Sequence, residues 1–292
     1  MNQAESVFPM SVLLFVSGHL TVAPLRLRRL RLSRLDLRKT SLVLAINSHF
    51  PMMPWLRLLL FAVLLCGWSP TAAAQLPART EFSVPLKDPD RWAEAINKFL
   101  NDEVTTPVLP GKIVATGSSS IGYWHKTLQQ DMAPLSIVPR GFGGSILYDL
   151  WYHREEVIFC PQPRAVILYV GDNDIATGLH PEEVMLILDS LCREIRQRLP
   201  ESRVYILSVK PSPSRWNLQP QFDALNALYQ QYAAEHPNTL FVEMRTVLLL
   251  PDGTPDPACY LRDGLHLNRE GYRRWTEVLR PVLLERELND LP

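Results

Sequence analysis

Five short apolar runs, rich in β-branched residues, recur along the chain and are separated by segments with helical periodicity. They span residues 112–117, 135–139, 165–171, 203–209 and 239–244. Runs that are apolar almost throughout are typical of strands buried on both faces, as in a parallel sheet. Parallel neighbours need crossover connections, and helices in those connections cover both faces of the sheet. The sequence therefore predicts an α/β protein, a three-layer α/β/α sandwich around a five-stranded parallel sheet.

Four segments beside these runs have the apolar spacing of helices: residues 88–103, 181–199, 220–236 and 270–287. The second is the clearest, because it begins with a proline and two glutamates and carries arginines near its end, as the helix dipole favours. No repeat or low-complexity linker interrupts residues 75–292, and a segment of this length can bury a sizeable core. We expect residues 75–292 to form a single domain.

Residues 52–74 have the order of a secretion signal. Arg57 is followed by an apolar run at residues 58–68 and by a polar segment that ends in three alanines. This order predicts a signal peptide cleaved after Ala74, and an exported protein, periplasmic or secreted, with no stable membrane insertion after cleavage. An uncleaved signal anchor is the alternative, although the apolar run is short for a membrane span.

Residues 1–51 precede this signal and include alternating Leu and Arg at residues 25–39. An organelle transit peptide or a membrane-surface segment would account for them, and so would a translation start at Met52 or Met53. We favour the later start, because a secretion signal begins at the N-terminus of a chain. With either interpretation we expect residues 1–51 to lie outside the fold.

Charge is unevenly distributed along the chain, although 30 basic and 30 acidic residues balance overall. Residues 75–292 hold 22 Lys and Arg and 28 Asp and Glu, a net charge of −6. This region lacks the basic excess of a nucleic-acid-binding protein and the polybasic patch that binds anionic lipid. We therefore expect no nucleic-acid partner.

The cysteines and histidines of this region have no metal-binding spacing. Cys160, Cys192 and Cys259 include no C-x-x-C pair, which argues against a zinc ribbon or a redox dithiol. They permit at most one internal disulfide, and three buried free thiols are the alternative. No ligand spacing is shared by His125, His153, His180 and His236. We expect no metal and no organic cofactor.

Ligands of parallel sheets bind beyond the carboxyl ends of the strands, so the segments that follow the strands are the candidate site. The first, TGSSSIGYW at residues 116–124, places three serines at the start of a helix, where a serine acts as a cap or as a nucleophile. The second, RGFGGSILYDL at residues 140–150, offers backbone N–H groups to an anion. It fails as a dinucleotide fingerprint because Ile146 stands at the third glycine position.

Two further segments supply side chains with catalytic chemistry. In YVGDNDIATG, residues 169–178, Asn173 or Asp174 points into the site unless the segment is only a turn. In RDGLHLNREGYRRW, residues 262–275, Asp263 lies three residues before His266. The carboxylate can then accept from one imidazole nitrogen while the other faces a substrate. A nucleophile, oxyanion donors, a base and an acid that orients it are the parts of an acyl-transfer site.

From about residue 111 to residue 284 the chain resembles the SGNH, or GDSL-type, hydrolase family. The resemblance rests on GSS at residues 117–119, GFGG at 141–144, GDND at 171–174 and DGLH at 263–266. It implies a flavodoxin-like architecture. It also implies Ser119 as nucleophile, His266 and Asp263 as its partners, and an oxyanion hole made by Ser119, Gly144 and Asn173.

Two residues depart from the family pattern. Ser118 replaces the aspartate of G-D-S, and Arg140 precedes GFGG where many relatives carry Asn or Asn-Arg. The first departure removes a charge beside the nucleophile and leaves Ser120 as an alternative nucleophile. A subgroup of the family carries GSSSI with a later tryptophan, so we do not interpret the change as inactivation.

These residues predict an exported serine ester hydrolase that acts on small acyl esters, such as an acetylated sugar. Two alternatives would use the same site: a lipid acyl hydrolase of the lysophospholipase or thioesterase type, and an acyltransferase to a carbohydrate. A non-catalytic carbohydrate- or lipid-binding module is a third. We favour short acyl chains, because the loops supply no long apolar lid or groove to receive a fatty chain.

Several side chains near the strand ends are candidates for substrate contact. Five aromatic residues either line an acyl or sugar pocket or pack in the core: Tyr123, Trp124, Phe142, Tyr148 and Trp216. Lys210 and Arg215, after the fourth strand, either meet a phosphate or carboxylate or are solvated loop charges. The sequence makes no prediction of the oligomeric state.

Overall fold

The computed structural model of the chain describes residues 11–16, 19–24, 76–105 and 110–288. The chain divides into two units, residues 1–68 and 69–292. In the first unit, β1 (Ser11–Val16) pairs with β2 (His19–Pro24) in antiparallel register. The predicted signal peptide and its cleavage point lie outside the described residues. The signal peptide, and the assignment of residues 1–51 to a segment outside the fold, stay predictions.

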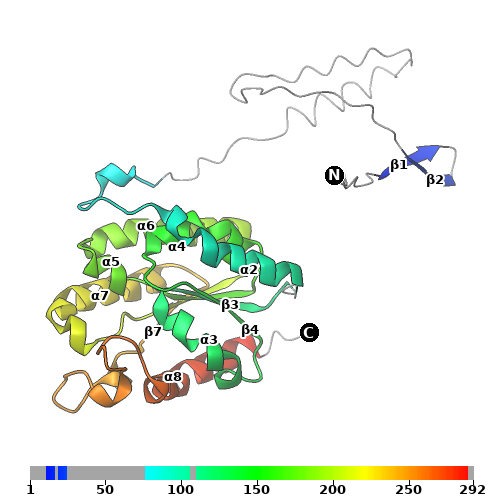
Figure 1. Cartoon of the computed structure of the whole chain (residues 1–292). Helices are drawn as coiled ribbons and strands as arrows, with labels where there is room; N and C mark the ends of the chain where they lie inside the picture. The colour runs from blue at the N-terminus through cyan, green and yellow to red at the C-terminus, as the bar shows by residue number, and fades with distance from the viewer. Residues whose placement is uncertain (1–10, 17–18, 25–75, 106–109, 289–292) are drawn as a thin grey trace, which may run out of the picture. The chain divides into compact units, whose positions relative to one another are not determined.

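The second unit contains a five-stranded sheet in which every strand is parallel to its neighbours (Figure 1). Its strands are β3 (Ile113–Gly117), β4 (Ile137–Gly141), β5 (Ala165–Tyr169), β6 (Arg203–Leu207) and β7 (Thr239–Val242). Their spatial order is β4-β3-β5-β6-β7, the flavodoxin-like order. After β3 the chain adds β4 on one side of it and then adds β5, β6 and β7 on the other side, so the order of strands across the sheet changes direction between β3 and β5. The predicted fold class is confirmed.

Helices cover both faces of this sheet (Figure 1). One face carries α2 (Ala93–Thr105), α4 (Leu147–Tyr152), α6 (Pro181–Arg198) and α7 (Gln219–Glu235). The other face carries α3 (Ser119–Asp131) and α8 (Arg269–Glu287), and the short α5 (Asp172–Ala176) follows β5 directly. Short helical segments complete the unit: η1 (Arg79–Glu81), η2 (Pro89–Trp92), η3 (Glu155–Phe159), η4 (Pro213–Leu218), η5 (Thr246–Leu248) and η6 (Pro257–Cys259).

Alternate side chains of the sheet enter two separate cores. On β5, Val166 and Leu168 pack with the layer of α2, α4, α6 and α7. Ile167 and Tyr169 point to the opposite face and pack with α3 and α8. Because both faces are covered, almost every residue of such a strand is apolar, which is why the runs were visible in the sequence.

The second strand lies two residues later than predicted, at Ile137–Gly141 instead of residues 135–139. Leu135 still belongs to a turn, in which its backbone N–H donates to the carbonyl of Met132 at 3.0 Å. Pro139 does not end the strand, because β4 is at the edge of the sheet and its outer N–H groups need no partner strand. The last three predicted strands begin where expected and end two residues early, because their final apolar residues already belong to the following loops.

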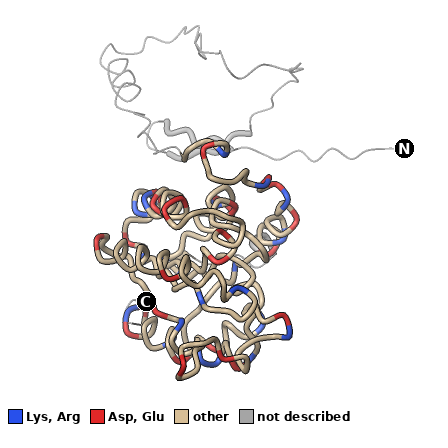
Figure 2. Tube along the Cα trace, turned by 90° about the vertical axis from the view of Figure 1, so that its left-hand side faces the viewer, with Lys and Arg blue, Asp and Glu red and all other residues tan. Residues whose placement is uncertain are grey.

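The described surface mixes charges of both signs, and blue and red segments are interspersed along the trace in Figure 2. None of the described helices is long and apolar enough to cross a membrane. Among the described cysteines, Cys160 is exposed, Cys192 and Cys259 are buried, and all three are free thiols. Burial raises the pKa of the Cys192 thiol to about 12, so that it is inert as a nucleophile.

A buried carboxylate at the end of α8 ties this helix to the amino ends of two central strands. Glu287 is fully buried and accepts hydrogen bonds from Arg164 (3.1 Å), Arg203 (2.7 and 3.1 Å) and the Tyr205 hydroxyl (2.5 Å). Arg164 also donates to the backbone carbonyl of Glu287 at 3.2 Å. A buried ion is tolerated only when its partners satisfy it, and here both carboxylate oxygens are satisfied.

We expect Glu287→Ala to lower the free energy of unfolding by about 3 kcal/mol, because removing one member of a buried ion-pair cluster leaves its partners uncompensated. Glu277→Ala is the matched control, since Glu277 is an exposed partner of Arg273 on the same helix and exposed ion pairs contribute little to stability. Urea unfolding of both variants measures the difference. Equal losses would show that the Glu287 cluster does not stabilise the fold.

Candidate active site

A glycine at the end of β3 places the three serines. Gly117 has φ +127°, and a Cβ there would lie 1.9 Å from the carbonyl oxygen of Tyr169 on β5. Only glycine fits so close to the neighbouring strand. The chain turns at this point from β3 into α3, of which Ser119 is the first residue. Ser118 occupies the cap position, but its side chain makes no capping hydrogen bond.

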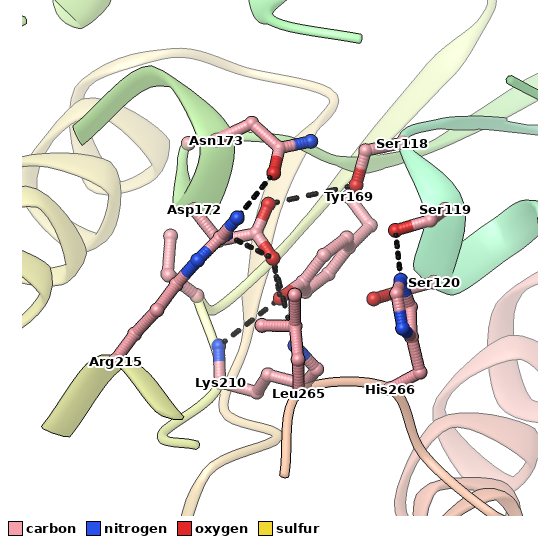
Figure 3. A network of polar contacts seen from close by, with 12 residues as sticks. Ser118, Ser119, Ser120, Tyr169, Asp172, Asn173, Lys210, Arg215, Leu265 and His266 are labelled. Atoms are coloured by element: carbon pink, nitrogen blue, oxygen red, sulfur yellow. Dashed lines mark hydrogen bonds and ion pairs between the residues drawn. The ribbon is translucent and has the colours of Figure 1, made fainter. Parts of the chain in front are cut away.

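Of the three serines, Ser119 is the one whose hydroxyl lies against a histidine. Its Oγ is 3.0 Å from Nε2 of His266 (Figure 3), although the two residues are 147 positions apart. Ser120 is buried, and the Ser118 hydroxyl lies 3.5 Å from Asp172 Oδ1. The contact with the imidazole therefore involves Ser119 and not the alternative, Ser120.

The turn before α8 holds the histidine. Nδ1 of His266 lies 2.6 Å from Oδ2 of Asp263, while Oδ1 of Asp263 accepts from the backbone N–H groups of Leu265 (2.9 Å) and His266 (3.0 Å). A carboxylate can only accept, so Nδ1 carries the proton and Nε2 is free to accept from the Ser119 hydroxyl. The Tyr123 ring covers the imidazole, with ring centroids 4.5 Å apart.

The Asp263 carboxyl is charged at any ordinary pH. Desolvation acts to raise its pKa, but the hydrogen bonds from the His266 side chain and from the backbone N–H groups of His266 and Leu265 outweigh it and lower the pKa to about 2. A charged acceptor holds the imidazole in one tautomer and stabilises the imidazolium when it forms.

The glycine-rich segment after β4 lies beside Ser119 at Gly143, not at Gly144. A Cβ on Gly143 would lie 3.8 Å from the Cβ of Ser119, and both residues line one cavity. Gly144 lines a different cavity, next to Trp92. These Cβ neighbours do not show which of the two glycines donates its backbone N–H, so the Gly144 assignment stays a prediction. GFGG contains both glycines, and nothing in the sequence distinguishes them. Among the described residues, no backbone hydrogen bond engages the N–H of Ser119, Gly143 or Gly144.

The segment after β5 brings Asn173 to the site and keeps Asp174 away from it. Asn173 Nδ2 donates to the carbonyl of Ser145 in the glycine-rich segment at 2.9 Å. Asp174 is fully buried and accepts from the backbone N–H groups of Leu147 (2.8 Å) and Gly171 (3.1 Å). Burial raises the pKa of Asp174 to about 7. Asp174 thus joins two loops, whereas Asn173 has an amide at the site.

The cavity beside Ser119 has a volume of about 600 Å³. Apolar and polar side chains share its wall, among them Tyr123, Lys126, Thr127, Leu261, Leu267 and Tyr272. Apolar contact is therefore available close to Ser119, and polar groups lie within the same cavity.

Of the five predicted substrate aromatics, only Tyr123 is among the residues that line this cavity. Trp124 is fully buried, stacks on Tyr272 and donates from Nε1 to Asp131 at 2.8 Å. Phe142 is buried against the rings of Trp92 and Phe99. The prediction of substrate contact is wrong for both, because each completes a core. Trp216 is exposed but lines a separate cavity of about 240 Å³.

The two basic residues after β6 are not solvated loop charges. Lys210 is 1% exposed, and its Nζ lies 3.5 Å from Asp172 Oδ2. Arg215 is mostly buried, lies 3.5 Å from the same carboxylate oxygen and donates to Asn173. No signal in the sequence indicated that these cations meet the segment after β5.

Comparison with known proteins places the chain among acyl hydrolases. The family of GDSL-like lipases/acylhydrolases matches residues 108–274, and no curated protein matches the chain. A solved structure described as an acylhydrolase from Bacteroides fragilis NCTC 9343 has a TM-score of 0.59 and 19% identity, over 69% of this chain and 100% of that one. A GDSL-like lipase from Bacteroides thetaiotaomicron VPI-5482 has a TM-score of 0.57 and 18% identity, over 65% of this chain and 97% of that one. These two structures share the fold described above.

We expect Asp263→Asn to remove a pH-dependent part of the folding stability. The pKa of Asp263 is about 2 in the folded chain and about 3.9 for an unperturbed aspartate. Its ionisation therefore stabilises the folded state above about pH 4, and this contribution disappears as the pH falls towards about 2. We expect the difference in unfolding free energy between the wild type and Asp263→Asn, measured by urea unfolding, to become smaller as the pH falls from about 5 to about 2. A difference in unfolding free energy that stays constant over this pH range would contradict the lowered pKa of Asp263.

Proposed function

Because the chain belongs to the GDSL-like lipase/acylhydrolase family, and is thus a carboxylic ester hydrolase, we propose that Ser119, His266 and Asp263 form its catalytic triad. The observation that supports this most directly is the alignment of the three side chains. Ser119 Oγ lies 3.0 Å from His266 Nε2, and His266 Nδ1 lies 2.6 Å from Asp263 Oδ2. Both distances are hydrogen-bond distances, as a nucleophile, its base and the orienting acid require.

In the first half-reaction, Ser119 Oγ attacks the ester carbonyl carbon while its proton passes to His266 Nε2. The imidazolium then protonates the departing alkoxide as the bond between the carbonyl carbon and the alcohol oxygen breaks, which leaves an acyl group on Ser119. In the second half-reaction, water attacks the acyl carbon, gives a proton to His266 and releases the acid, and Ser119 recovers its proton. Asp263 remains ionised throughout.

The negative charge that develops on the carbonyl oxygen needs hydrogen-bond donors. The backbone N–H of Ser119 is at the start of α3, where the helix dipole favours an anion. We assign the other donors to the backbone N–H of Gly144 or of its neighbour Gly143, in the segment after β4, and to Nδ2 of Asn173, in the segment after β5. Each such donor is worth about 2.7–4 kcal/mol of transition-state stabilisation.

Short acyl esters are the substrates that the cavity supports best. Tyr123, Leu261 and Leu267 can contact a small acyl group, whereas Lys126 and Thr127 in the same wall suit a polar alcohol such as a sugar. A long chain gains about 0.8 kcal/mol for each CH₂ only where an apolar groove receives it. We therefore propose esters of acetyl to butyryl groups as the preferred substrates.

We expect hydrolysis of p-nitrophenyl esters to be fastest for acetate to butyrate and to fall towards palmitate. Ser119→Ala should lower kcat by about 10³-fold or more, as loss of a triad nucleophile does. Ser120→Ala is the matched control and should retain most of the activity. Stopped assays with acetylated xylan and a lysophospholipid extend the series to natural esters.

Three outcomes would contradict parts of this proposal. Full activity of Ser119→Ala would exclude the triad, and an inactive Ser120→Ala would move the nucleophile by one residue. A steady rise of kcat/KM towards long chains, with fatty acid released from the lysophospholipid, would replace the short-acyl substrates by lipids.

We also propose that the enzyme is exported and that its mature chain begins at Gln75. The support is the order of basic, apolar and small residues at positions 52–74. When the full-length gene is expressed, N-terminal sequencing of the exported protein should read from Gln75. Peptides from the Arg-rich residues 25–39 in the exported protein would contradict a start at Met52 or Met53.

A further inference from the structure

We propose that Arg215 is a positioning residue that holds the Asn173 amide in the orientation needed to stabilise the oxyanion. The inference rests on the proposed function and extends it to the loop after β6. Arg215 lies in η4, on a different loop from the nucleophile, the base and the orienting acid. Its Nη2 donates to Asn173 Oδ1 at 2.9 Å, as Figure 3 shows.

The partners of Asn173 leave its amide one orientation. Oδ1 faces the Arg215 guanidinium, which can only donate, and Nδ2 faces the Ser145 carbonyl, which can only accept. A flipped amide would set donor against donor and acceptor against acceptor. One N–H of Nδ2 binds Ser145 O, so the second N–H of the same nitrogen is left for a substrate oxygen. The guanidinium also withdraws electrons from the amide, which makes that N–H a stronger donor.

A buried carboxylate holds the guanidinium in place. Asp172 Oδ2 lies 3.5 Å from Arg215 Nη1, 3.5 Å from Lys210 Nζ and 3.2 Å from the Tyr169 hydroxyl, which donates to it. One acid thus serves two basic side chains beneath the site (Figure 3). Asp172 and Asn173 are consecutive residues at the start of α5. Arg215 therefore contacts both the carboxylate that holds it and the amide that it positions.

The loop that carries Arg215 also contacts the loop of the acid and base. The backbone N–H of Ser214 donates to the carbonyl of Gly264 at 3.0 Å, and the Tyr260 hydroxyl donates to the carbonyl of Pro211 at 2.6 Å. Gly264 lies between Asp263 and His266. Residues 210–216 therefore contact both the loop of the catalytic base and the oxyanion amide, and so fix the position of His266 relative to Asn173.

The test compares Arg215→Met with Arg245→Met. Arg245 is a matched control, because it is similarly buried (26% exposed, against 19% for Arg215) and ion-paired, but with Glu243 and Asp223. We expect Arg215→Met to lower kcat by about 10- to 100-fold, as loss of a residue that orients a catalytic group does, with KM changed less than about twofold. Arg215→Lys keeps a charged donor and should recover part of kcat. Arg245→Met should match the wild type.

A double-mutant cycle separates positioning from a structural effect. Asn173→Ala alone should lower kcat by about 10²–10³-fold. In that background Arg215→Met should have almost no further effect, because the amide it positions is gone. An undiminished effect of Arg215→Met in the Asn173→Ala background, or a rise in KM with kcat unchanged, would overturn the proposal.

Circular dichroism and thermal unfolding establish that each variant is folded. If Arg215→Met does not fold, Arg215→Lys takes its place in the cycle, with a smaller loss of kcat that again vanishes in the Asn173→Ala background. The Ser119→Ala variant distinguishes a failure of the proposed function from a failure of the role of Arg215. If it is active, the proposed function fails. If it is inactive while Arg215→Met equals Arg245→Met, only the role of Arg215 fails.

Discussion

The close approach of β3 to β5 at Gly117 is the constraint on which the rest of the site depends. The backbone of Gly117 lies against the Tyr169 carbonyl, and the same carbonyl accepts from the N–H of Ser118 at 3.2 Å. The order of the strands reverses between these two strands, so their loops diverge from adjacent points. One loop begins α3 with Ser119, and the other carries Asn173. The backbone pairing of β3 with β5 therefore brings the loops that carry Ser119 and Asn173 to adjacent strand ends.

Two buried carboxylates lie at opposite ends of the sheet, and each is shared between two basic side chains. Glu287 is shared between two arginines at the amino ends of β5 and β6, and Asp172 is shared between Lys210 and Arg215 beyond their carboxyl ends. The first cluster joins α8 to the amino ends of β5 and β6. The second contacts Asn173 through Arg215. Under the proposed function, this cluster holds the amide that stabilises the oxyanion.

Where sequence-based assignments of the site went wrong, the reason was local ambiguity. Trp124 and Phe142 near strand ends could line a pocket or complete a core, and only the packing of α3 and the glycine-rich segment shows the second. In the fold, the predicted start of β4 was wrong because the backbone hydrogen bonds of the turn at Leu135 do not depend on particular residue types.

The sequence by itself determined the layers of the fold, the segments after the strands that build the site, and the pairing of Asp263 with His266. These follow from local rules: apolar periodicity, glycine at a strand end, and two side chains within one turn. Only the tertiary structure decided that Ser119 is the serine against His266 and that Arg215 binds Asn173. Those contacts join residues 147 and 42 positions apart. Their distances depend on how the strands are ordered and how the loops pack, which no short stretch of sequence encodes.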